Sequence, residues 1–166
     1  MDLTSAPVPP VAGDDHVRGD PDAPLAIMYA DFACPHCAVA HLRLQEAGLR
    51  TVFRHFALKA KHPRAPILAA AAEAAALQGA FWPMHDSLYA DQGRQDDPHL
   101  WARAEALGLD VARFEEDRRS EAVQQRVKRD VRAALRAGAA TTPTLWIAGR
   151  QHAGAPSAAI LDSVRK

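Results

Sequence analysis

The fold is decided by the stretch Asp31-Phe32-Ala33-Cys34-Pro35-His36-Cys37, which holds both cysteines of the chain. An apolar run that begins at Leu25 leads into it and predicts a buried strand. A Cys-x-x-Cys pair placed after a strand and at the start of a helix is typical of redox-active cysteines. If the helix begins at Cys34, its sulfur lies beside unpaired backbone N–H groups at the positive end of the helix dipole, which lowers the pKa of the thiol. We therefore expect Cys34 to be the attacking sulfur and Cys37, one turn later, to close a disulfide with it.

The length and composition are those of a globular protein without an excess of either charge. With 166 residues the chain can form one domain, or one domain with an insertion. Its twenty basic residues balance its twenty acidic ones, so the charge gives no reason to expect nucleic acid or a membrane surface as a partner. No stretch approaches the roughly 18 consecutive apolar residues of a membrane-spanning helix.

The cell compartment is an expectation from the first residues alone. The stretch from Met1 to Pro7 lacks the positive and apolar regions of a secretory signal. We expect a cytoplasmic protein as the sequence is written, or a periplasmic or otherwise extracytoplasmic one if a leader has been removed. Both cysteines lie in the motif, so no structural disulfide indicates an oxidising compartment.

The first third of the chain predicts a strand, a helix and a second strand. Residues 1–20 are rich in Pro, Gly and Asp, which predicts a flexible leader that becomes ordered near Val17. The predicted elements are a strand over 25–31, a helix over 37–49 and a strand over 51–58. This order implies that the two strands are parallel and joined by a right-handed crossover.

The middle of the chain predicts helices only, and the end predicts a hairpin and a helix. Trp101 and Phe114 are expected in the core of the helical part. Thr144–Ala148 predicts a strand, Gly149-Arg150 a tight turn and 151–153 an antiparallel partner. Pro156 is expected to open the last helix. The helices of the middle part are predicted over 63–77, 81–89, 97–108, after Asp110, and from Ser120 to Gly138.

Four segments resemble the DsbA-like thiol–disulfide oxidoreductases. They are 19–24 (Gly-Asp-Pro-Asp-Ala-Pro), 31–37, 53–58 (Phe-Arg-His-Phe-Ala-Leu) and 142–145 (Thr-Pro-Thr-Leu), and they span most of the chain in the expected order. The resemblance implies an α/β protein with a thioredoxin-like fold and an inserted all-helical domain. We accordingly expect three parts: a leader over 1–20, a discontinuous thioredoxin-like domain over 21–61 and 139–166, and a helical insertion over 62–138.

The resemblance also implies how a substrate would be held. Pro143 would follow a cis peptide bond and face the cysteine pair. Thr142 would offer backbone groups to an extended substrate segment, as in strand addition, with Pro35 also on the substrate side. No cofactor other than the cysteine pair is implied. The implied partners are protein or peptide thiols and disulfides and one further redox protein, and we expect a monomer.

The sequence departs from the family at one position. Relatives often carry a buried carboxylate six residues before the first cysteine, where it helps to move the proton of the second thiol, and here that position is Met28. Asp31 is a possible proton shuttle instead. Strand alternation puts Asp31 on the opposite face from Met28, so we expect proton transfer at Cys37 to be slower or to use water.

His36 can donate to the thiolate of Cys34 or place a charge beside it.

Two other kinds of function stay open at this point, a small-thiol enzyme and a binding module without activity. A metal-carrying module could use both cysteines with His36, but zinc sites usually need four ligands, His41 is expected on a helix surface, and we expect no metal. An isomerase or transferase that uses glutathione or another small thiol could share the scaffold, although such an enzyme typically keeps one nucleophile and Cys37 argues against it. A peptide-holding module without activity is the last alternative.

Overall fold

The computed structural model describes residues 5–165, which form two compact units. The first unit comprises residues 5–30, 36–56 and 130–165, and the second comprises residues 31–35 and 57–129. The loop that carries Cys34 is therefore assigned to the second unit, although the strand before it and most of the helix after it belong to the first.

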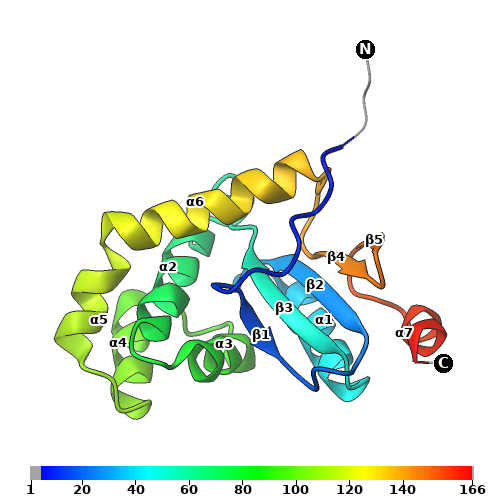
Figure 1. Ribbon diagram of the computed structural model, residues 1–166. Coiled ribbons are helices and arrows are strands. Elements are labelled where there is room, and N and C mark those ends of the chain that lie inside the picture. Colours follow the sequence, from blue (N-terminus) through cyan, green and yellow to red (C-terminus); the bar gives the residue numbers. More distant parts are fainter. Residues whose placement is uncertain (1–4, 166) are drawn as a thin grey trace. The chain divides into compact units, whose positions relative to one another are not determined.

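The first unit is built on one five-stranded sheet in the order β1-β3-β2-β4-β5 (Figure 1). β2 and β3 are parallel, as predicted, and the other neighbouring strands are antiparallel. The strands are β1 (His16–Arg18), β2 (Leu25–Ala30), β3 (Arg50–His55), β4 (Thr144–Ile147) and β5 (Arg150–Ala153).

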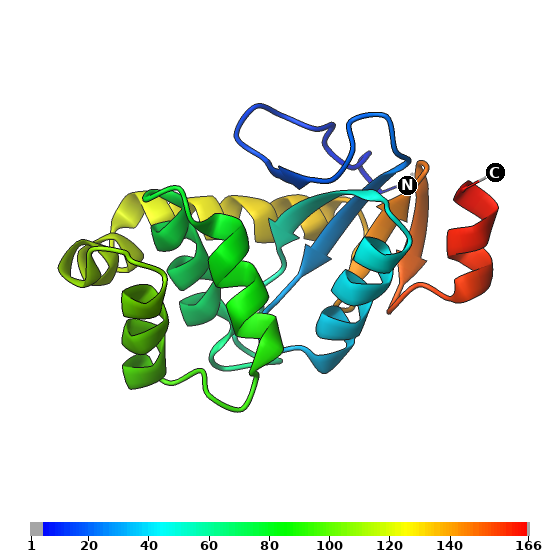
Figure 2. The ribbon, with the colours of Figure 1, turned by 90° about the horizontal axis from the view of Figure 1, so that it is seen from below.

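Helix α1 (Pro35–Glu46) connects the two parallel strands and lies over one face of the sheet (Figure 2). Its buried side is formed by Cys37, Ala40, His41 and Leu44. The expectation that His41 lies on the helix surface is wrong, because its ring is buried and its Nδ1 lies 3.3 Å from a guanidinium nitrogen of Arg18.

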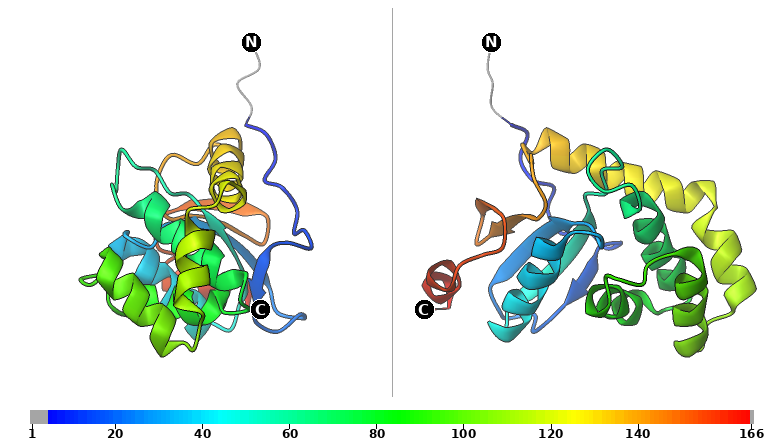
Figure 3. Two further views of the ribbon diagram at one scale, coloured as in Figure 1. Left: turned by 90° about the vertical axis from the view of Figure 1, so that its left-hand side faces the viewer. Right: turned by 180° about the vertical axis from the view of Figure 1, so that it is seen from behind.

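The second unit consists of helices packed beside one another (Figure 3). Phe114 is buried as expected, but Trp101 is 39% exposed because its ring N–H turns outward to donate to Glu115. Small side chains let the first helix pack closely against its neighbours, and most of its alanines are buried. The helices are α2 (Ala65–Ala76), α3 (Phe81–Ala90), α4 (Asp97–Ala106), α5 (Val111–Arg118) and the first part of α6 (Glu121–Arg136).

β1 forms where the leader is expected to become ordered, and it pairs with β3 through Val17 and Val52. Two other local expectations differ from the structure. The hairpin turn is formed by Ala148 and Gly149, which both have positive φ, so β5 begins at Arg150. The last helix, α7 (Ala158–Val164), is capped by Ser157, whose hydroxyl accepts the N–H of Ile160, and does not begin at Pro156.

Arg54 ties the segment before β1 to the sheet. Its guanidinium forms a two-point ion pair with Asp15, with N–O distances of 2.9 and 2.8 Å, and both side chains are buried. It also donates to the backbone oxygens of Pro9 and Pro10 at 2.7 and 2.9 Å and to the hydroxyl of Tyr29 at 3.0 Å. Burial alone would lower the pKa of Arg54, but its bonds to Asp15 and Tyr29 outweigh burial and raise it. Residues 9–15 are thus held by the guanidinium of Arg54 in β3. The composition of this segment does not predict such a contact.

We expect Arg54→Leu to lower the free energy of unfolding by about 3 kcal/mol or more, because it leaves the carboxylate of Asp15 buried without its counter-charge. Urea unfolding followed by circular dichroism measures the loss. As a matched control, Arg165→Leu removes the exposed pair with Asp162 and should cost less than about 1 kcal/mol. Equal effects of the two variants would contradict this account of the buried pair.

A second ionic group lies in the helical unit around Glu115. Its carboxylate accepts from Arg118 at 2.9 Å, from the ring of Trp101 at 2.8 Å and from Arg119 at 2.8 Å. The bond from Arg118 lowers the pKa of Glu115 to about 2, against the opposing effect of burial.

The lowered pKa predicts an acid-sensitive contribution to stability. Because the folded pKa lies below the ordinary value of 4.5, the contribution is fully present above about pH 4.5 and is lost as the pH falls towards about 2. We expect Glu115→Gln to flatten the dependence of the unfolding free energy on pH in this window, as measured by urea unfolding at a series of pH values. An unchanged slope would show that Glu115 does not contribute in this way.

Candidate active site

The two cysteines lie where the chain passes from β2 into α1. Cys34 immediately precedes the first helical residue, Pro35, and Cys37 lies in the first turn. Both cysteines are buried, at 2% and 0% exposure, whereas Pro35 and His36 are exposed. Cys34 therefore occupies the position that Ser or Asp takes when it caps a helix.

The first turn of α1 offers Cys34 a restricted set of donors. Pro35 has no N–H, so the first backbone donors of the helix are those of His36 and Cys37. These groups stand at the positive end of the helix dipole, which favours a thiolate over a thiol at the residue before the helix. His36, at the second helical position, presents its imidazole on the surface next to the buried sulfur-bearing residues.

The sheet register brings the predicted substrate segment to the same end of the sheet. Tyr29, near the carboxyl end of β2, pairs with Thr144, the first residue of β4. The residues before β4 are Thr142 and Pro143, and the peptide bond between them is cis. The carbonyl of Pro143 accepts the N–H of Gly154 at 2.8 Å, which fixes this turn to the strand that follows β4. The strand that leads into the cysteine motif and the segment before β4 thus lie at the same end of the sheet.

Asp31 is buried in the loop before Cys34 and is paired with a histidine. One carboxylate oxygen accepts the N–H of Ala33 at 2.8 Å, and the other lies 2.9 Å from Nδ1 of His62. The side chain of Asp31 is 1% exposed and that of His62 is 26% exposed. β2 ends at Ala30, so Asp31 lies in the loop after the strand, where strand alternation does not define its face relative to Met28. Its role as a proton shuttle stays a prediction.

Met28 lies between apolar residues of the two neighbouring strands. It is 1% exposed, and it pairs in register with Phe53 of β3 and Leu145 of β4. The surroundings of this position on both neighbouring strands are therefore apolar, in keeping with a methionine and not with a carboxylate.

The aromatic side chains of α3 hold the middle of the redox loop. The hydroxyl of Tyr89 donates to the backbone oxygen of Asp31 at 3.0 Å. The ring of Phe32, which is fully buried, lies 5.0 Å from the ring of Tyr89 and 5.7 Å from that of His85. These contacts bury the loop backbone against the helical unit, to which it belongs.

Two glutamines in the turn after α3 complete the contacts of this loop. The amide nitrogen of Gln92 donates to the backbone oxygens of Phe32 and Cys34, both at 3.0 Å. The amide nitrogen of Gln95 donates to Phe32 at 2.9 Å. Sequence reasoning missed these glutamines and His62, because contacts from one side chain to a distant backbone leave no periodic signal in the sequence.

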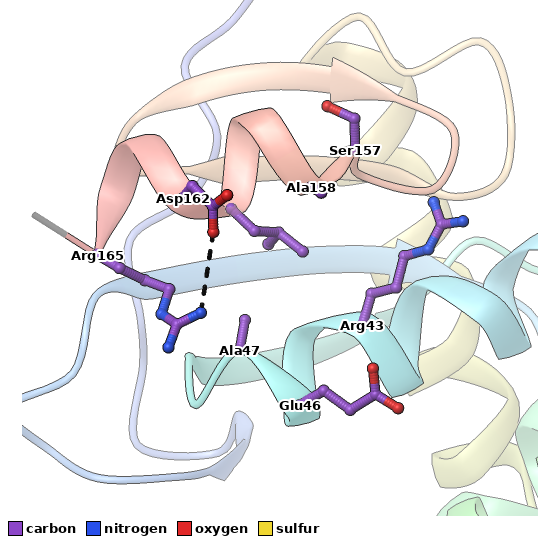
Figure 4. Close-up of a pocket in the computed structure, with 8 residues that line it drawn as sticks. Arg43, Glu46, Ala47, Ser157, Ala158, Asp162 and Arg165 are labelled. Carbon is purple, nitrogen blue, oxygen red and sulfur yellow. Dashed lines mark ion pairs between the residues drawn. The ribbon is translucent and has the colours of Figure 1, made fainter.

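A groove of about 500 Å³ lies elsewhere in the first unit, between the end of α1 and α7 (Figure 4). Charges of both signs line it, including Arg43, whose guanidinium donates to the backbone oxygen of Pro156 at 3.0 Å. None of the predicted site residues lines this groove. Its lining residues are Arg43, Glu46, Ala47, Ser157, Ala158, Leu161, Asp162 and Arg165.

Comparison with known proteins identifies the family. The family model described as "Thioredoxin" matches residues 11–164. Among curated proteins, the chain is 42% identical to the Na(+)/H(+) antiporter NhaA 3 of Salinispora tropica, over 90% of this chain and 24% of that protein. It is also 42% identical to the Na(+)/H(+) antiporter NhaA of Herminiimonas arsenicoxydans, over 99% of this chain and 28% of that protein. The chain thus spans about a quarter of the length of these curated relatives. Within residues 5–165, no helix has the length and apolar character needed to cross a membrane.

Solved structures share the fold over almost the whole chain. A thioredoxin-like oxidoreductase from Silicibacter pomeroyi superposes with a TM-score of 0.81 at 21% identity, over 92% of this chain and 91% of that one. DsbA2 of Pseudomonas aeruginosa gives a TM-score of 0.74 at 25% identity, over 93% and 94% of the two chains. The α-DsbA1 protein of Wolbachia pipientis gives 0.77 at 20% identity, over 93% and 92%. With the family model matching most of its length, the chain belongs to the thioredoxin family, and the predicted resemblance to the DsbA-like members is confirmed.

Proposed function

We propose that this chain is a thiol–disulfide oxidoreductase that exchanges disulfides with protein or peptide substrates through Cys34 and Cys37. The observation that carries the proposal is the placement of Cys34 directly before α1, with Cys37 in the first turn of the same helix. Its structural neighbours support the same chemistry, since they include a thioredoxin-like oxidoreductase and a thiol-disulfide exchange protein.

The proposed exchange begins with the cysteine pair in its disulfide form. A substrate thiolate attacks the sulfur of Cys34, the bond between Cys34 and Cys37 breaks, and the sulfur of Cys37 leaves and takes up a proton. A second substrate thiolate then attacks the substrate sulfur of the mixed disulfide, and Cys34 leaves as a thiolate. Two electrons have passed from the substrate dithiol to the cysteine pair, and the substrate has gained a disulfide. The reverse sequence reduces a substrate disulfide.

The stability of the Cys34 thiolate sets the direction that the exchange favours. A more stable thiolate makes the reduced form more stable and the disulfide form a stronger oxidant. In this chain the helix N-terminus and the exposed imidazole of His36 both stabilise negative charge at Cys34. Asp31, paired with His62, is the nearest buried carboxyl group on the loop and the proposed group for proton transfer.

The segment before β4 is the proposed substrate-binding edge. Pro143 and Thr142 stand at the sheet end where β2 leads into the motif, and the exposed ring of Pro35 follows Cys34 directly. An extended substrate segment would bind the backbone of Thr142 by strand addition, which places its cysteine towards Cys34. The exchange needs no cofactor besides the cysteine pair, and a second redox protein would restore that pair after each turnover.

We expect Cys34→Ser to abolish oxidative refolding of a reduced model protein and reduction of insulin, because the attacking sulfur is gone. Cys37→Ser should instead retain attack and accumulate mixed disulfides, which non-reducing electrophoresis detects. Circular dichroism spectra of both variants serve as the folding control.

Three outcomes would contradict the proposal or favour an alternative to it. Unchanged turnover in Cys34→Ser would end the proposal. Activity of Cys37→Ser on a small electrophile in the presence of glutathione would favour a small-thiol transferase. One equivalent of metal in protein purified without added metal would favour a metal carrier.

We also expect His36→Ala to raise the pKa of Cys34 by about one unit, because it removes a donor or positive charge beside the thiolate. The pKa is measured from the ultraviolet absorbance of the thiolate against pH, in the Cys37→Ser background. As a matched control, His99→Ala removes an exposed histidine from α4 and should leave the pKa unchanged. If both variants behave like the parent, His36 has no part in stabilising the thiolate.

A further inference from the structure

The loop that carries the nucleophile is bonded to helices that lie far from it in sequence. Residues 31–35 form one compact unit with residues 57–129. Two of its backbone oxygens are bound by glutamine side chains, that of Phe32 by Gln92 and Gln95 and that of Cys34 by Gln92. Gln92 thus bonds the backbone oxygen of Cys34 as well as that of Phe32, which directs attention to this side chain.

We propose that Gln92 is a positioning residue that holds the backbone around Cys34 and thereby stabilises its thiolate. This inference rests on the proposed function, because it concerns the reactivity of the sulfur to which that function assigns the attack. The two bonds of Gln92 go to backbone oxygens, and its amide carries no charge and no titrating proton.

The geometry restrains two peptide groups of the loop, the one that joins Phe32 to Ala33 and the one that joins Cys34 to Pro35. One amide nitrogen has two hydrogens, and here each goes to a different carbonyl oxygen, that of Phe32 and that of Cys34, at 3.0 Å. The carbonyl of Cys34 belongs to the peptide group that joins it to Pro35, the first residue of α1. Fixing this peptide group fixes how the N–H groups of His36 and Cys37 are turned relative to the side chain of Cys34.

The same hydrogen bonds also affect the electrostatic stability of the Cys34 thiolate. Carbonyl oxygens carry partial negative charge, and an oxygen close to the sulfur destabilises a thiolate unless a donor compensates it. The amide hydrogens of Gln92 supply that compensation at Phe32 and Cys34. Restraint of the peptide group and compensation of the carbonyls therefore have the same sign, and both lower the pKa of Cys34.

The turn that carries Gln92 is itself held in place by hydrogen bonds from two arginines. The guanidinium of Arg64 donates to the backbone oxygen of Gln95 at 2.6 Å, and that of Arg103 donates to the backbone oxygen of Asp91 at 2.8 Å and to that of Arg94. These contacts hold the turn at both ends, so the amide of Gln92 is presented from a fixed position and not from a free loop.

The test compares glutamine variants in the intact chain. Gln92→Met has a similar length and removes both donors. We expect it to raise the pKa of Cys34 by about one unit, which lowers the thiolate-to-thiol ratio about tenfold at any given pH. At a pH above both pKa values, the equilibrium constant of the chain with both cysteines against glutathione should shift about tenfold towards the disulfide form, a potential lower by about 30 mV.

Two further glutamines provide graded controls. Gln95→Met removes a bond to Phe32 but none to Cys34, so we expect a smaller rise of the pKa. Gln78→Met removes two comparable bonds to the backbone of Asp110, at 3.1 and 2.9 Å, and should leave the pKa and the potential unchanged. Equal shifts in all three variants would indicate a general loosening of the helical unit and would overturn the proposal.

The readouts separate this inference from the proposed function. The thiolate pKa and the glutathione equilibrium do not require turnover, so they decide the role of Gln92 even if no substrate protein is oxidised or reduced. An unchanged pKa in Gln92→Met overturns the inference and leaves the oxidoreductase proposal intact. If Gln92→Met does not fold, Gln92→Glu retains size and polarity but puts a carboxylate beside the two carbonyls, and it should raise the pKa by at least as much. An unchanged pKa in Gln92→Glu would equally overturn the inference.

Discussion

The parallel pairing of β2 with β3 is the constraint on which the rest of the first unit depends. Two adjacent parallel strands need a crossover, and the chain makes it with α1, so the helix has to begin at the sheet end where β2 stops. The N-terminus of that helix, with its unpaired N–H groups, is therefore delivered to the same place as the loop that carries Cys34. The antiparallel pairing of β4 with β2 then brings the residues before Thr144 to this end as well. Three backbone features meet there because of strand directions alone.

Much of this arrangement could be predicted from the sequence because it follows local patterns. The strand over 25–30, the helix after the motif and the Thr-Leu-Trp-Ile strand each have a clear apolar pattern with Gly or Pro boundaries. β1 could not be found, because three residues in a segment rich in Pro and Asp give no alternation, and its pairing with β3 depends on the distant Val52. Trp101 was misplaced because an aromatic residue in a helix is usually buried, and only the position of Glu115 shows why its ring turns outward.

The residues of the candidate site likewise divide into those that the sequence predicts and those that it does not. Cys34, Cys37 and the Thr142–Pro143 segment stand in recognisable motifs, whereas His62, Gln92 and Gln95 were missed. The bonds from these residues to Asp31, Phe32 and Cys34 join positions 31 to 63 residues apart, and such contacts depend on how the helices fold back on the loop. The helical unit includes this loop and bonds its backbone, through Tyr89 at Asp31 and through Gln92 at Cys34. A substitution in these helices can reach the sulfur through the backbone without changing a residue of the motif.

The two outer strands have a consequence for how copies of the protein meet. One edge of the sheet is β1, which is only three residues long, and the other is β5, whose residues Arg150, Gln151 and Ala153 are exposed. Short, polar or charged edges are poor templates for a foreign strand. The edges of the sheet therefore offer little to pair with, which disfavours growth of the sheet from one molecule into the next.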